Sequence, residues 1–467
     1  MPTLTFTSDM PVPAADLFAW HDRPGAFMRL APPWAPVQLE RFEGIRDGQQ
    51  AVIRLGIPPA TLRWVAEHRN YVTGEQFQDV QLKGPFARWA HTHRMEPVDD
   101  ATSRLVDYIE YAVPLGRLGE TVGGSLIRKQ LHGQFAYRHR ITRNDLTLHH
   151  RYNPDGKRLR IAVTGASGLI GSALVGFMQT GGHEVLRLVR TKPVGEGEVY
   201  WNIRAGEIDA SALEGLDAFI HLAGENVFAW RWSEAKKQRI LESRTQGTRL
   251  LAEALAQLDT PPATFISASG IGYYGDTGGE AVDEQALRNA DGFLADVVRQ
   301  WEAAADPARQ AGIRTVHPRI GIVLSPKGGA LKQMLSPFKL GGGGTIGAAH
   351  LNMSWIALDD VIGALYHALW TPALSGPVNL TAPNPATMRT FAKTLASVLK
   401  RPSWTHVPGG ALKLAMGEVA EETLLKSIRA VPSRLQGTNY TFLFPDLREA
   451  LAHQLGRTLD GVTMETT

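Results

Sequence analysis

Apolar and polar residues alternate along much of the first 112 residues, which is the pattern of strands with one buried face. A run at 4–7 is followed by a short helical pattern at 13–20, and then by further alternating runs with turn residues between them. These predicted strands cover residues 37–42, 51–55, 62–72, 76–82, 87–96 and 103–112. A long helical pattern at 123–142 closes the segment. Strands followed by a long helix predict an α+β domain over residues 1–152.

A different pattern begins after the polar segment 151–157, which we interpret as a linker. Short, continuously apolar runs now alternate with helical patterns, as they do for the buried strands of a parallel sheet. The runs lie at 158–163, 183–189, 218–224, 263–269 and 315–324, and the longest helical pattern lies at 234–258. The sequence therefore predicts an α/β doubly wound parallel sheet over 158–467. Helical patterns at 388–399 and 418–430 predict a small C-terminal α+β part within residues 330–460.

Length and composition narrow the class of protein. A chain of 467 residues is expected to form two or three domains, and its 43% hydrophobic content can fill sizeable cores. The absence of cysteine excludes disulfides, thiolate catalysis and Cys-ligated metals. No apolar run reaches about 18 residues, and the N-terminus lacks the regions of a signal peptide, so we expect a cytoplasmic protein without a membrane span. The net charge of +3, with dispersed basic residues, gives no indication of nucleic-acid binding.

The run at 158–163 leads into three glycines spaced three apart and then into a helical pattern. Together with the run at 183–189, this segment forms a βαβ unit of about 30 residues. In such a unit the glycines allow a tight turn whose backbone N–H groups approach a pyrophosphate at the helix N-terminus. The alternative is a glycine turn without a ligand. The residues expected to contact a dinucleotide here are Gly165, Ser167, Gly168, Leu169, Ile170 and Gly171.

The end of the second strand bears on which dinucleotide binds. NAD-preferring units carry an acidic residue there for the ribose hydroxyls, whereas this chain has Arg190, followed by Thr191 and Lys192. A guanidinium suits a 2′-phosphate through its charge and its forked donors. We therefore predict NADP(H) in preference to NAD(H). A solvated arginine that simply leaves a strand is the alternative.

Element order and two segments, Pro13–Trp20 and Phe27–Trp34, characterise the first domain. In these features it resembles the START-like (SRPBCC, helix-grip) family. In that family a curved sheet wraps a long C-terminal helix around an apolar cavity. The resemblance implies a cavity for a hydrophobic small molecule and identifies no ligand.

His91 and His93 alternate on one face of a predicted strand, a spacing that could place two imidazoles on one metal ion. A third ligand is not apparent in the sequence, and strand histidines are often surface or cavity-lining residues. We therefore predict no metal site.

Seven segments of the second domain form a specific set: Thr164–Gly171, His221–Asn226, Arg231–Ser233, Glu242–Arg244, Ser269–Gly275, Met334–Gly344 and Ser354–Ile356. Through them, residues 158–456 resemble the extended short-chain dehydrogenase/reductase superfamily, and within it the epimerase-like YfcH-type subgroup. Some members of that subgroup carry a START-like domain in front. The resemblance implies an NAD(P)-binding Rossmann fold.

Two further groups of residues are expected near the cofactor. Leu222, Ala223 and Gly224 end a strand at the carboxyl edge of the sheet, where small residues let the backbone approach adenine and ribose. The resemblance implies that Arg244 contacts the phosphate region of NADP alongside Arg190. An exposed helical arginine is the alternative for Arg244.

The chemistry of the superfamily uses a Ser or Thr that orients the substrate and a Tyr-x-x-x-Lys pair whose tyrosine transfers a proton. By this resemblance Ser269 is the orienting serine, with a turn-capping serine as the alternative. The helix that should carry the pair has Phe293 and Val297 at the two positions, and neither side chain can transfer a proton. Tyr273 or Tyr274 could supply the acid, or both could pack in the cleft.

Two acidic residues, Asp359 and Asp360, precede a helical pattern that starts at Val361. Carboxylates at this position accept hydrogen bonds from the first N–H groups of a helix and favour its dipole. We predict that they cap the helix rather than act as catalytic acids.

Two functions follow from the sequence. The first is an NADP(H)-binding epimerase or oxidoreductase that acts on an unidentified small molecule, with an apolar ligand in the first domain. The second is an NADP(H)-binding sensor or assembly protein without turnover, which the missing Tyr-x-x-x-Lys pair favours. The sequence gives neither the substrate nor the oligomeric state.

Overall fold

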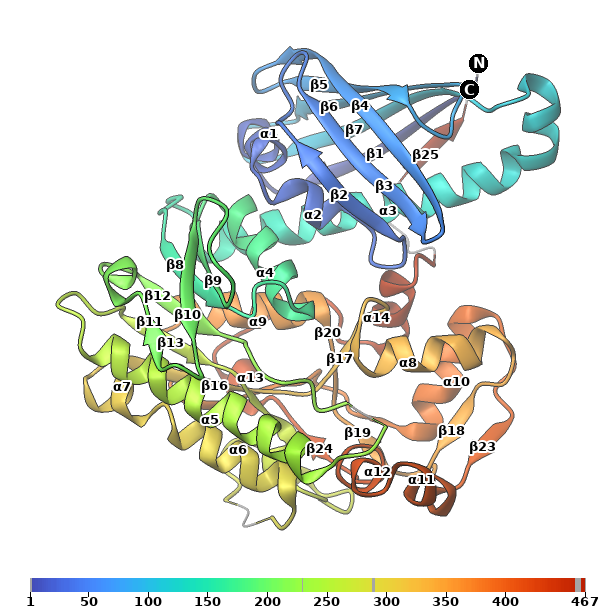
Figure 1. The fold of residues 1–467 in the computed structure, drawn as a ribbon. Coiled ribbons are helices and arrows are strands. Elements are labelled where there is room, and N and C mark those ends of the chain that lie inside the picture. Colours follow the sequence, from blue (N-terminus) through green and yellow to red (C-terminus); the bar gives the residue numbers. More distant parts are fainter. Residues whose placement is uncertain (1, 229, 288–289, 458–462, 467) are drawn as a thin grey trace. The chain divides into compact units, whose positions relative to one another are not determined.

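The computed structural model describes residues 2–228, 230–287, 290–457 and 463–466. These residues form two compact units (Figure 1). The first unit is built from the described residues of Met1–Lys157, Gly176–Gly182 and Ala452–Thr467, and the second from those of Arg158–Val175 and His183–Leu451. Residues 176–182 and the segment from 452 onward thus group with the first unit, whereas the predicted second domain included them.

The first unit is built on an eight-stranded antiparallel sheet. Its strand order is β2-β3-β4-β5-β6-β7-β1-β25, so β2 to β7 form a meander and β1 and β25 complete the edge beside β7. The strands are β1 (Thr3–Met10), β2 (Val37–Phe42), β3 (Gln50–Ile57), β4 (Ala60–Val72), β5 (Gln76–Lys83), β6 (Arg88–Pro97), β7 (Ser103–Ala112) and β25 (Thr463–Thr466). The six strands predicted between 37 and 112 agree with β2 to β7 within two residues.

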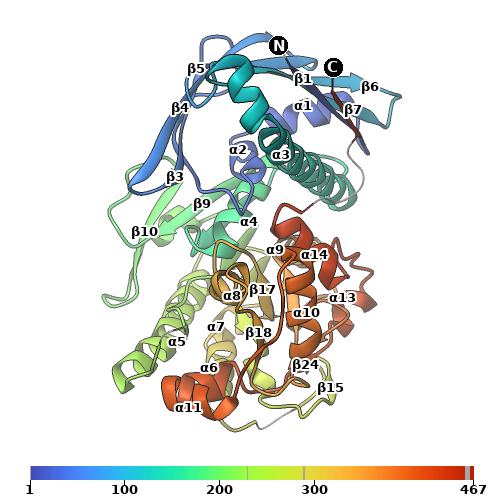
Figure 2. The ribbon, with the colours of Figure 1, turned by 90° about the vertical axis from the view of Figure 1, so that its right-hand side faces the viewer.

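Three helices accompany this sheet: α1 (Ala14–Asp22), α2 (Ala26–Leu30) and α3 (Gly116–Tyr152). Figure 2 shows the sheet curving around α3. Burial alternates along β7, and on the buried side Phe6 of β1 stacks on Phe135 of α3 with ring centroids 4.6 Å apart. α3 is longer than the helix predicted at 123–142. The prediction missed its first turns because residues there, such as Leu118 and Val122, are exposed and give no amphipathic pattern. None of the described helices, α3 included, combines the length and apolar character needed to cross a membrane.

A mainly parallel sheet forms the centre of the second unit. Its order is β11-β10-β9-β8-β12-β13-β16-β14, with β21 beside β16, so the strand order reverses between β8 and β12. The strands are β8 (Arg160–Thr164), β9 (Glu184–Val189), β10 (Glu198–Asn202), β11 (Glu207–Ile208), β12 (Ala218–His221), β13 (Thr264–Ser267), β14 (Ser269–Gly270), β16 (Arg314–Ile320) and β21 (Gly376–Leu380). The predicted doubly wound α/β architecture is confirmed.

Helices cover both faces of this sheet, as Figure 1 shows. On one side lie α5 (Glu234–Ala256), α6 (Phe293–Ala303) and α7 (Asp306–Gln310), and on the other α4 (Leu169–Thr180) and α9 (Leu358–Trp370). Leu251 and Leu255 of α5 pack with Phe219 and Phe265 of the sheet in one buried cluster. The buried strands and the apolar helix faces explain the continuous apolar runs in the sequence.

Shorter elements complete the second unit, and the last of them runs past residue 451 into the segment that groups with the first unit. They are the 3₁₀ helices η1 (Ala210–Leu213) and η2 (Ile271–Tyr274), the strands β15 (Ala281–Val282), β17 (Ile322–Leu324), β18 (Gly344–Ile346), β19 (Asn352–Met353), β20 (Trp355–Ala357), β22 (Ala386–Thr387), β23 (Thr405–Val407) and β24 (Arg429–Ala430), and the helices α8 (Gly329–Lys339), α10 (Met388–Leu399), α11 (Gly409–Met416), α12 (Glu418–Thr423), α13 (Ser433–Gly437) and α14 (Leu447–Gln454). The helix predicted at 388–399 matches α10. The helix predicted at 418–430 was wrong in its second half, because β24 pairs there with β15.

Candidate functional site

The glycine turn lies between β8 and α4, at the carboxyl end of the parallel sheet. Gly165 has a φ of +68°, which an L side chain rarely adopts, and a Cβ atom there would lie 2.9 Å from the backbone nitrogen of Ala223. A Cβ atom on Gly171 would collide with the carbonyl oxygen of Gly165. Both positions therefore require glycine if the turn is to close. A helix start of this kind presents backbone N–H groups to an anion.

Thr164 and His221 connect the ends of β8 and β12, where the strand order reverses. The Thr164 hydroxyl oxygen lies 2.6 Å from Nδ1 of His221 and accepts hydrogen bonds from the N–H groups of Leu222 (3.1 Å) and Ala223 (3.2 Å). Burial, reinforced by the charge of Arg244, lowers the pKa of His221 to about 3. The imidazole is therefore neutral at physiological pH, and Thr164 can donate its proton to Nδ1. This network fixes the strand end that is expected to face adenine and ribose.

The two arginines expected near the cofactor phosphates have different surroundings. Arg190 is exposed, directly after the last residue of β9. Arg244 lies on α5, where it donates to the carbonyl oxygen of Glu225 at 3.0 Å and stands 5.0 Å from the centre of the Trp301 ring. Burial lowers its pKa to about 10, so it stays charged at neutral pH. A Cβ atom on Gly224 would lie 3.4 Å from the guanidinium carbon, which places Arg244 against the end of β12.

Ser269 lies in β14, where it is paired with Arg319 of β16. Its hydroxyl donates to Oε1 of Glu302 at 2.6 Å. Glu302 also accepts two hydrogen bonds from Arg319, of 2.8 and 2.9 Å. Burial by itself would raise the pKa of Glu302, but the Arg319 guanidinium outweighs that effect and lowers it. An ionised carboxylate that the sequence did not single out therefore holds Ser269.

Tyr273 and Tyr274 are neighbours in η2 but have different environments. Tyr274 is fully buried, donates to Oδ1 of Asn379 at 2.8 Å and accepts from Arg319 at 3.1 Å. Burial raises the pKa of Tyr274 to about 12. Tyr273 is half-buried, and the Arg319 guanidinium carbon lies 3.4 Å from the centre of its ring. These surroundings favour packing for Tyr274 and leave Tyr273 as the more accessible of the two.

The two positions of the missing Tyr-x-x-x-Lys pair are occupied by packing residues. Phe293 begins α6, and its ring packs edge-on against Trp232 with centroids 5.2 Å apart. Val297, one turn later, is buried. The cation that contacts both tyrosine rings is instead Arg319, from β16.

The Met334–Gly344 segment, one of those that carried the family resemblance, lines an apolar cleft of about 390 Å³ in the second unit. α8, β18, β23 and α11 contribute to it. Trp230 also lines the cleft and exposes 71% of its surface. Exposed aromatic surface beside a concave apolar wall is typical of a ligand-binding region.

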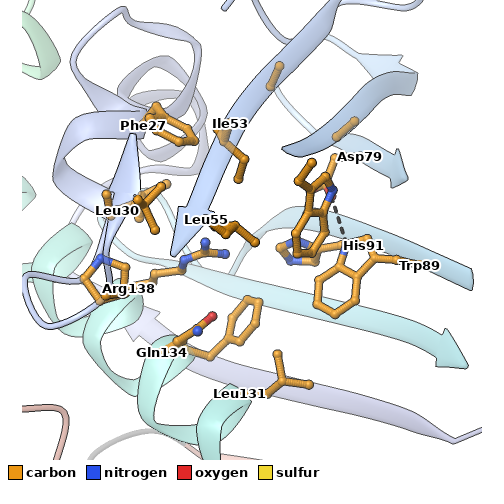
Figure 3. Close-up of a pocket in the computed structure, with 18 of the residues that line it drawn as sticks. Phe27, Leu30, Ile53, Leu55, Asp79, Trp89, His91, Leu131, Gln134 and Arg138 are labelled. Carbon is orange, nitrogen blue, oxygen red and sulfur yellow. Dashed lines mark hydrogen bonds and ion pairs between the residues drawn. The ribbon is translucent and has the colours of Figure 1, made fainter. Parts of the chain in front are cut away.

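The first unit contains a cavity of about 430 Å³ lined by its sheet and by α3 (Figure 3). Most of its wall is apolar and includes Phe27, Leu30, Ile53, Leu55, Trp89 and Leu131. Polar groups from α3, Gln134 and Arg138, also face it.

A cluster of ionisable side chains forms part of this wall. His91 and His93 of β6 are buried and lie beside Asp79 of β5, which pairs with His91 in the sheet. Burial opposes a charged imidazole, yet the carboxylates of Asp79 and Asp107 raise the pKa of His91 to about 9. Asp79 could not be predicted from the sequence, because strand pairing, rather than residue spacing, brings it to the histidines.

A strand, glycine turn and helix at the point where a doubly wound parallel sheet reverses its order define an NAD(P)-binding α/β protein. Comparison with known families agrees. The model of the NAD dependent epimerase/dehydratase family matches residues 161–380, and that of a domain of unknown function, DUF1731, matches residues 407–454.

Relatives give the same assignment. The chain is 42% identical over 297 residues to an epimerase family protein of Mycobacterium tuberculosis, MT2273, covering 64% of this chain and 98% of that protein. It is 36% identical over 299 residues to the human epimerase family protein SDR39U1, covering 63% of this chain and 98% of that protein. The chain belongs to this epimerase family. The predicted epimerase-like family is thus confirmed, and the human relative carries the name SDR39U1 rather than YfcH.

Two solved structures are also similar. One is described as the nucleoside-diphosphate sugar epimerase from Corynebacterium glutamicum, with a TM-score of 0.80 and 34% identity, covering 97% of this chain and 90% of that one. The other is human SDR39U1 with NADPH, with a TM-score of 0.59 and 34% identity, covering 64% of this chain and 99% of that one. The likeness to the first structure extends over both units, whereas the second corresponds to about two thirds of the chain.

Proposed function

We propose that this chain binds NADP(H) across the carboxyl ends of β8 and β12 and uses it in epimerase- or oxidoreductase-type chemistry on a small molecule. The observation that carries the proposal is the packing of the Gly165–Gly171 turn against the end of β12. A turn closed in this way lets the backbone N–H groups at the start of α4 approach a dinucleotide pyrophosphate. The related human structure described with NADPH supports the same ligand.

Two arginines support NADP(H) over NAD(H). Arg190 follows β9, where NAD-preferring units carry an acidic residue for the ribose hydroxyls, and its exposed guanidinium offers forked donors for a 2′-phosphate. Arg244 adds a second positive charge against Gly224. A guanidinium in place of a carboxylate favours the nucleotide with the extra phosphate.

Titration with NADPH and with NADH, followed by nucleotide fluorescence, tests this preference. We expect NADPH to bind at least about tenfold more tightly, because hydrogen bonds between charged groups contribute about 1.5–3 kcal/mol. Arg190→Ala should remove most of the preference. The matched control Arg204→Ala, at an exposed arginine after β10, should leave it unchanged. Equal affinities of the unaltered protein for the two nucleotides would refute the NADP(H) proposal.

For turnover, Ser269 would orient the substrate through the hydroxyl that Glu302 holds. Arg319, whose guanidinium carbon lies over the Tyr273 ring, would take the place of the lysine of the Tyr-x-x-x-Lys pair. Tyr273, which Arg319 covers and which is more accessible than Tyr274, is then the proton donor.

Incubation with NADPH and a panel of carbonyl compounds and nucleoside-diphosphate sugars tests turnover. The sugars are included because the similar Corynebacterium glutamicum structure is described as an epimerase of that class. Tyr273→Phe should abolish turnover and leave the NADPH affinity unchanged. Tyr274→Phe should instead lower stability by about 1–3 kcal/mol, because it leaves buried polar partners unsatisfied. Full activity in Tyr273→Phe would assign packing to both tyrosines.

A non-catalytic NADP(H)-binding sensor or assembly protein is the second candidate. The observation that favours it is the packing role of Phe293 and Val297 at the two positions of the catalytic pair. This candidate predicts tight NADPH binding without oxidation of the nucleotide by any member of the panel.

The cavity of the first unit is assigned to an apolar small molecule, as the START-like resemblance implies. Its volume of about 430 Å³ falls in the range of small-molecule pockets, and its wall is largely apolar. Leu55→Trp, which fills the cavity, should weaken binding of a hydrophobic fluorescent dye. Leu118→Trp, at an exposed position of α3, is the control and should not. Equal dye binding in both variants would contradict the assignment.

A further inference from the structure

Three possible metal ligands converge in the cavity of the first unit. Nδ1 of His91 lies 3.0 Å from Oδ1 of Asp79, and Nε2 of His93 lies 3.4 Å from the same oxygen. One ligand atom from each of the three residues lies within 4.8 Å of the other two. Tetrahedral zinc with bonds of about 2.0–2.2 Å holds its ligand atoms about 3.3–3.5 Å apart. The two contacts to Asp79 are close to that spacing.

Each of the three side chains is held from behind by another group. Nε2 of His91 lies 3.0 Å from Oδ1 of Asp107 in hydrogen-bonding geometry. Nδ1 of His93 lies 2.7 Å from the same oxygen, an electrostatic contact that is not aligned as a hydrogen bond. Oδ2 of Asp79 accepts from the indole N–H of Trp89 at 3.0 Å. Metal-binding histidines are commonly oriented by a carboxylate on their far nitrogen, which is the place of Asp107 here.

Asp107 is in turn fixed by the core. Its second oxygen, Oδ2, lies 2.8 Å from Nε2 of His139 on α3, and both residues are buried. One carboxylate thus contacts three imidazoles. The cluster joins β5, β6, β7 and α3, so the positions of its ligand atoms are set by the sheet and the long helix together.

The three converging residues also line the cavity. Figure 3 shows Asp79, His91 and Trp89 close together in one part of the cavity, while aliphatic side chains such as Leu30 and Leu131 line other parts of the same space. A metal ion with two imidazoles, one carboxylate and a position open to a cavity is the usual arrangement of catalytic zinc and of related divalent metals. We propose that Asp79, His91 and His93 bind a divalent transition-metal ion of the zinc type, with an open position that takes an oxygen donor of an apolar ligand.

The three ligand residues are not among those expected to bind the dinucleotide, so the test does not require NADP(H). The full-length protein, freed of metal by a chelator, is titrated with Zn²⁺ by calorimetry. One Zn²⁺ ion per chain is expected. Asp79→Asn and His93→Gln should each weaken binding at least about 100-fold. His350→Gln, at an exposed histidine of the second unit, is the matched control and should bind as the unaltered protein does.

A second measurement needs no variant and covers the case in which the ligand variants do not fold. X-ray absorption of the zinc-loaded, unaltered protein should show nitrogen and oxygen ligands at about 2.0–2.2 Å with the scattering pattern of two imidazoles. Absence of stoichiometric Zn²⁺ binding would overturn the proposal and leave an ionic network without a metal. A zinc spectrum without imidazole, or equal affinity in folded Asp79→Asn, would overturn it as well.

Discussion

The two candidate sites of this molecule are built in opposite ways. The dinucleotide site depends on backbone geometry, in which two glycines of one short segment let a turn close against the end of a neighbouring strand. The cluster in the cavity depends on side chains, and its members come from three strands and a helix. Short-range construction makes the first site sensitive to single atoms added to the backbone. Long-range construction makes the second sensitive to the folding of its whole unit.

The largest effect is expected from breaking the folding of the first unit. Arg29 and Asp145 form a buried ion pair with hydrogen bonds of 2.7 and 2.8 Å. Asp145→Ala leaves a buried arginine without this partner, and we expect the free energy of unfolding to fall by about 3–5 kcal/mol. Chemical denaturation followed by circular dichroism measures this.

The control for this prediction is the exposed pair Asp9–Arg104 of the same unit. Asp9→Ala should cost less than about 1 kcal/mol. If the two sites are as separate as their construction indicates, NADPH affinity should stay within about twofold in both variants. A large loss of NADPH binding in Asp145→Ala would show that the sites are coupled.

The second prediction breaks the backbone-built site. In Gly171→Ala the added methyl group collides with the carbonyl oxygen of Gly165 and lies 3.0 Å from Cα of Ala166. The turn must open, and NADPH affinity should fall at least about 100-fold, or about 2.7 kcal/mol. Gly410→Ala, where a Cβ atom meets nothing within 4 Å, should bind as before. Nucleotide fluorescence provides the measurement, and tight binding in Gly171→Ala would contradict the role given to the turn.

The third prediction concerns pH and the stability of the second unit. Asp360 is buried, and burial raises its pKa to about 7, above the unfolded value of about 3.8. Between these values the folded protein holds a proton that the unfolded chain releases. The stabilising contribution of this proton to the free energy of unfolding is therefore complete below about pH 4 and is lost as the pH rises through 7. It amounts to about 2 kcal/mol between pH 5 and pH 7.

Denaturation of the unaltered protein and of Asp360→Asn across this range isolates that contribution. At low pH Asp360→Asn should be less stable than the unaltered protein, because an amide cannot accept every hydrogen bond that the carboxyl group accepts. Its stability should nevertheless change less with pH. Parallel curves for the two proteins would show that Asp360 does not titrate in this window.

The sequence predicted what is local and repetitive. The strands from 37 to 112, the βαβ unit and the glycine turn all follow from residues close together in the chain, so period and spacing reveal them. Glu302 lies far from Ser269 in sequence, and no pattern links them, since their contact depends on α6 packing at the sheet edge. Asp79 was missed for the same reason. The catalytic roles of Ser269, Tyr273 and Tyr274 stay predictions.

Asp359 and Asp360 show how a sound local rule can be overridden. Both lie in the first turn of α9, as expected of acidic residues at a helix start, yet the N-cap residue is Ala357, which makes no side-chain capping hydrogen bond. The carboxylate of Asp360 instead accepts hydrogen bonds from the backbone N–H groups of Leu443 (2.7 Å) and Phe444 (2.9 Å). The segment that contains Leu443 and Phe444 thus competes with the helix N-terminus for the same oxygens, and the helical pattern around residue 361 cannot reveal this.

The pairing of β25 with β1 has a consequence for how the protein is made. β1 leaves the ribosome before the second unit and β25 after it, with Leu4 opposite Thr466 in the finished sheet. The edge of β1 therefore stays uncovered while the second unit is being synthesised, and an uncovered strand edge can pair with a neighbouring chain. A protein engineer who truncates this chain after residue 451, or fuses another protein there, would therefore alter the first unit, although residue 451 follows the second unit in the sequence.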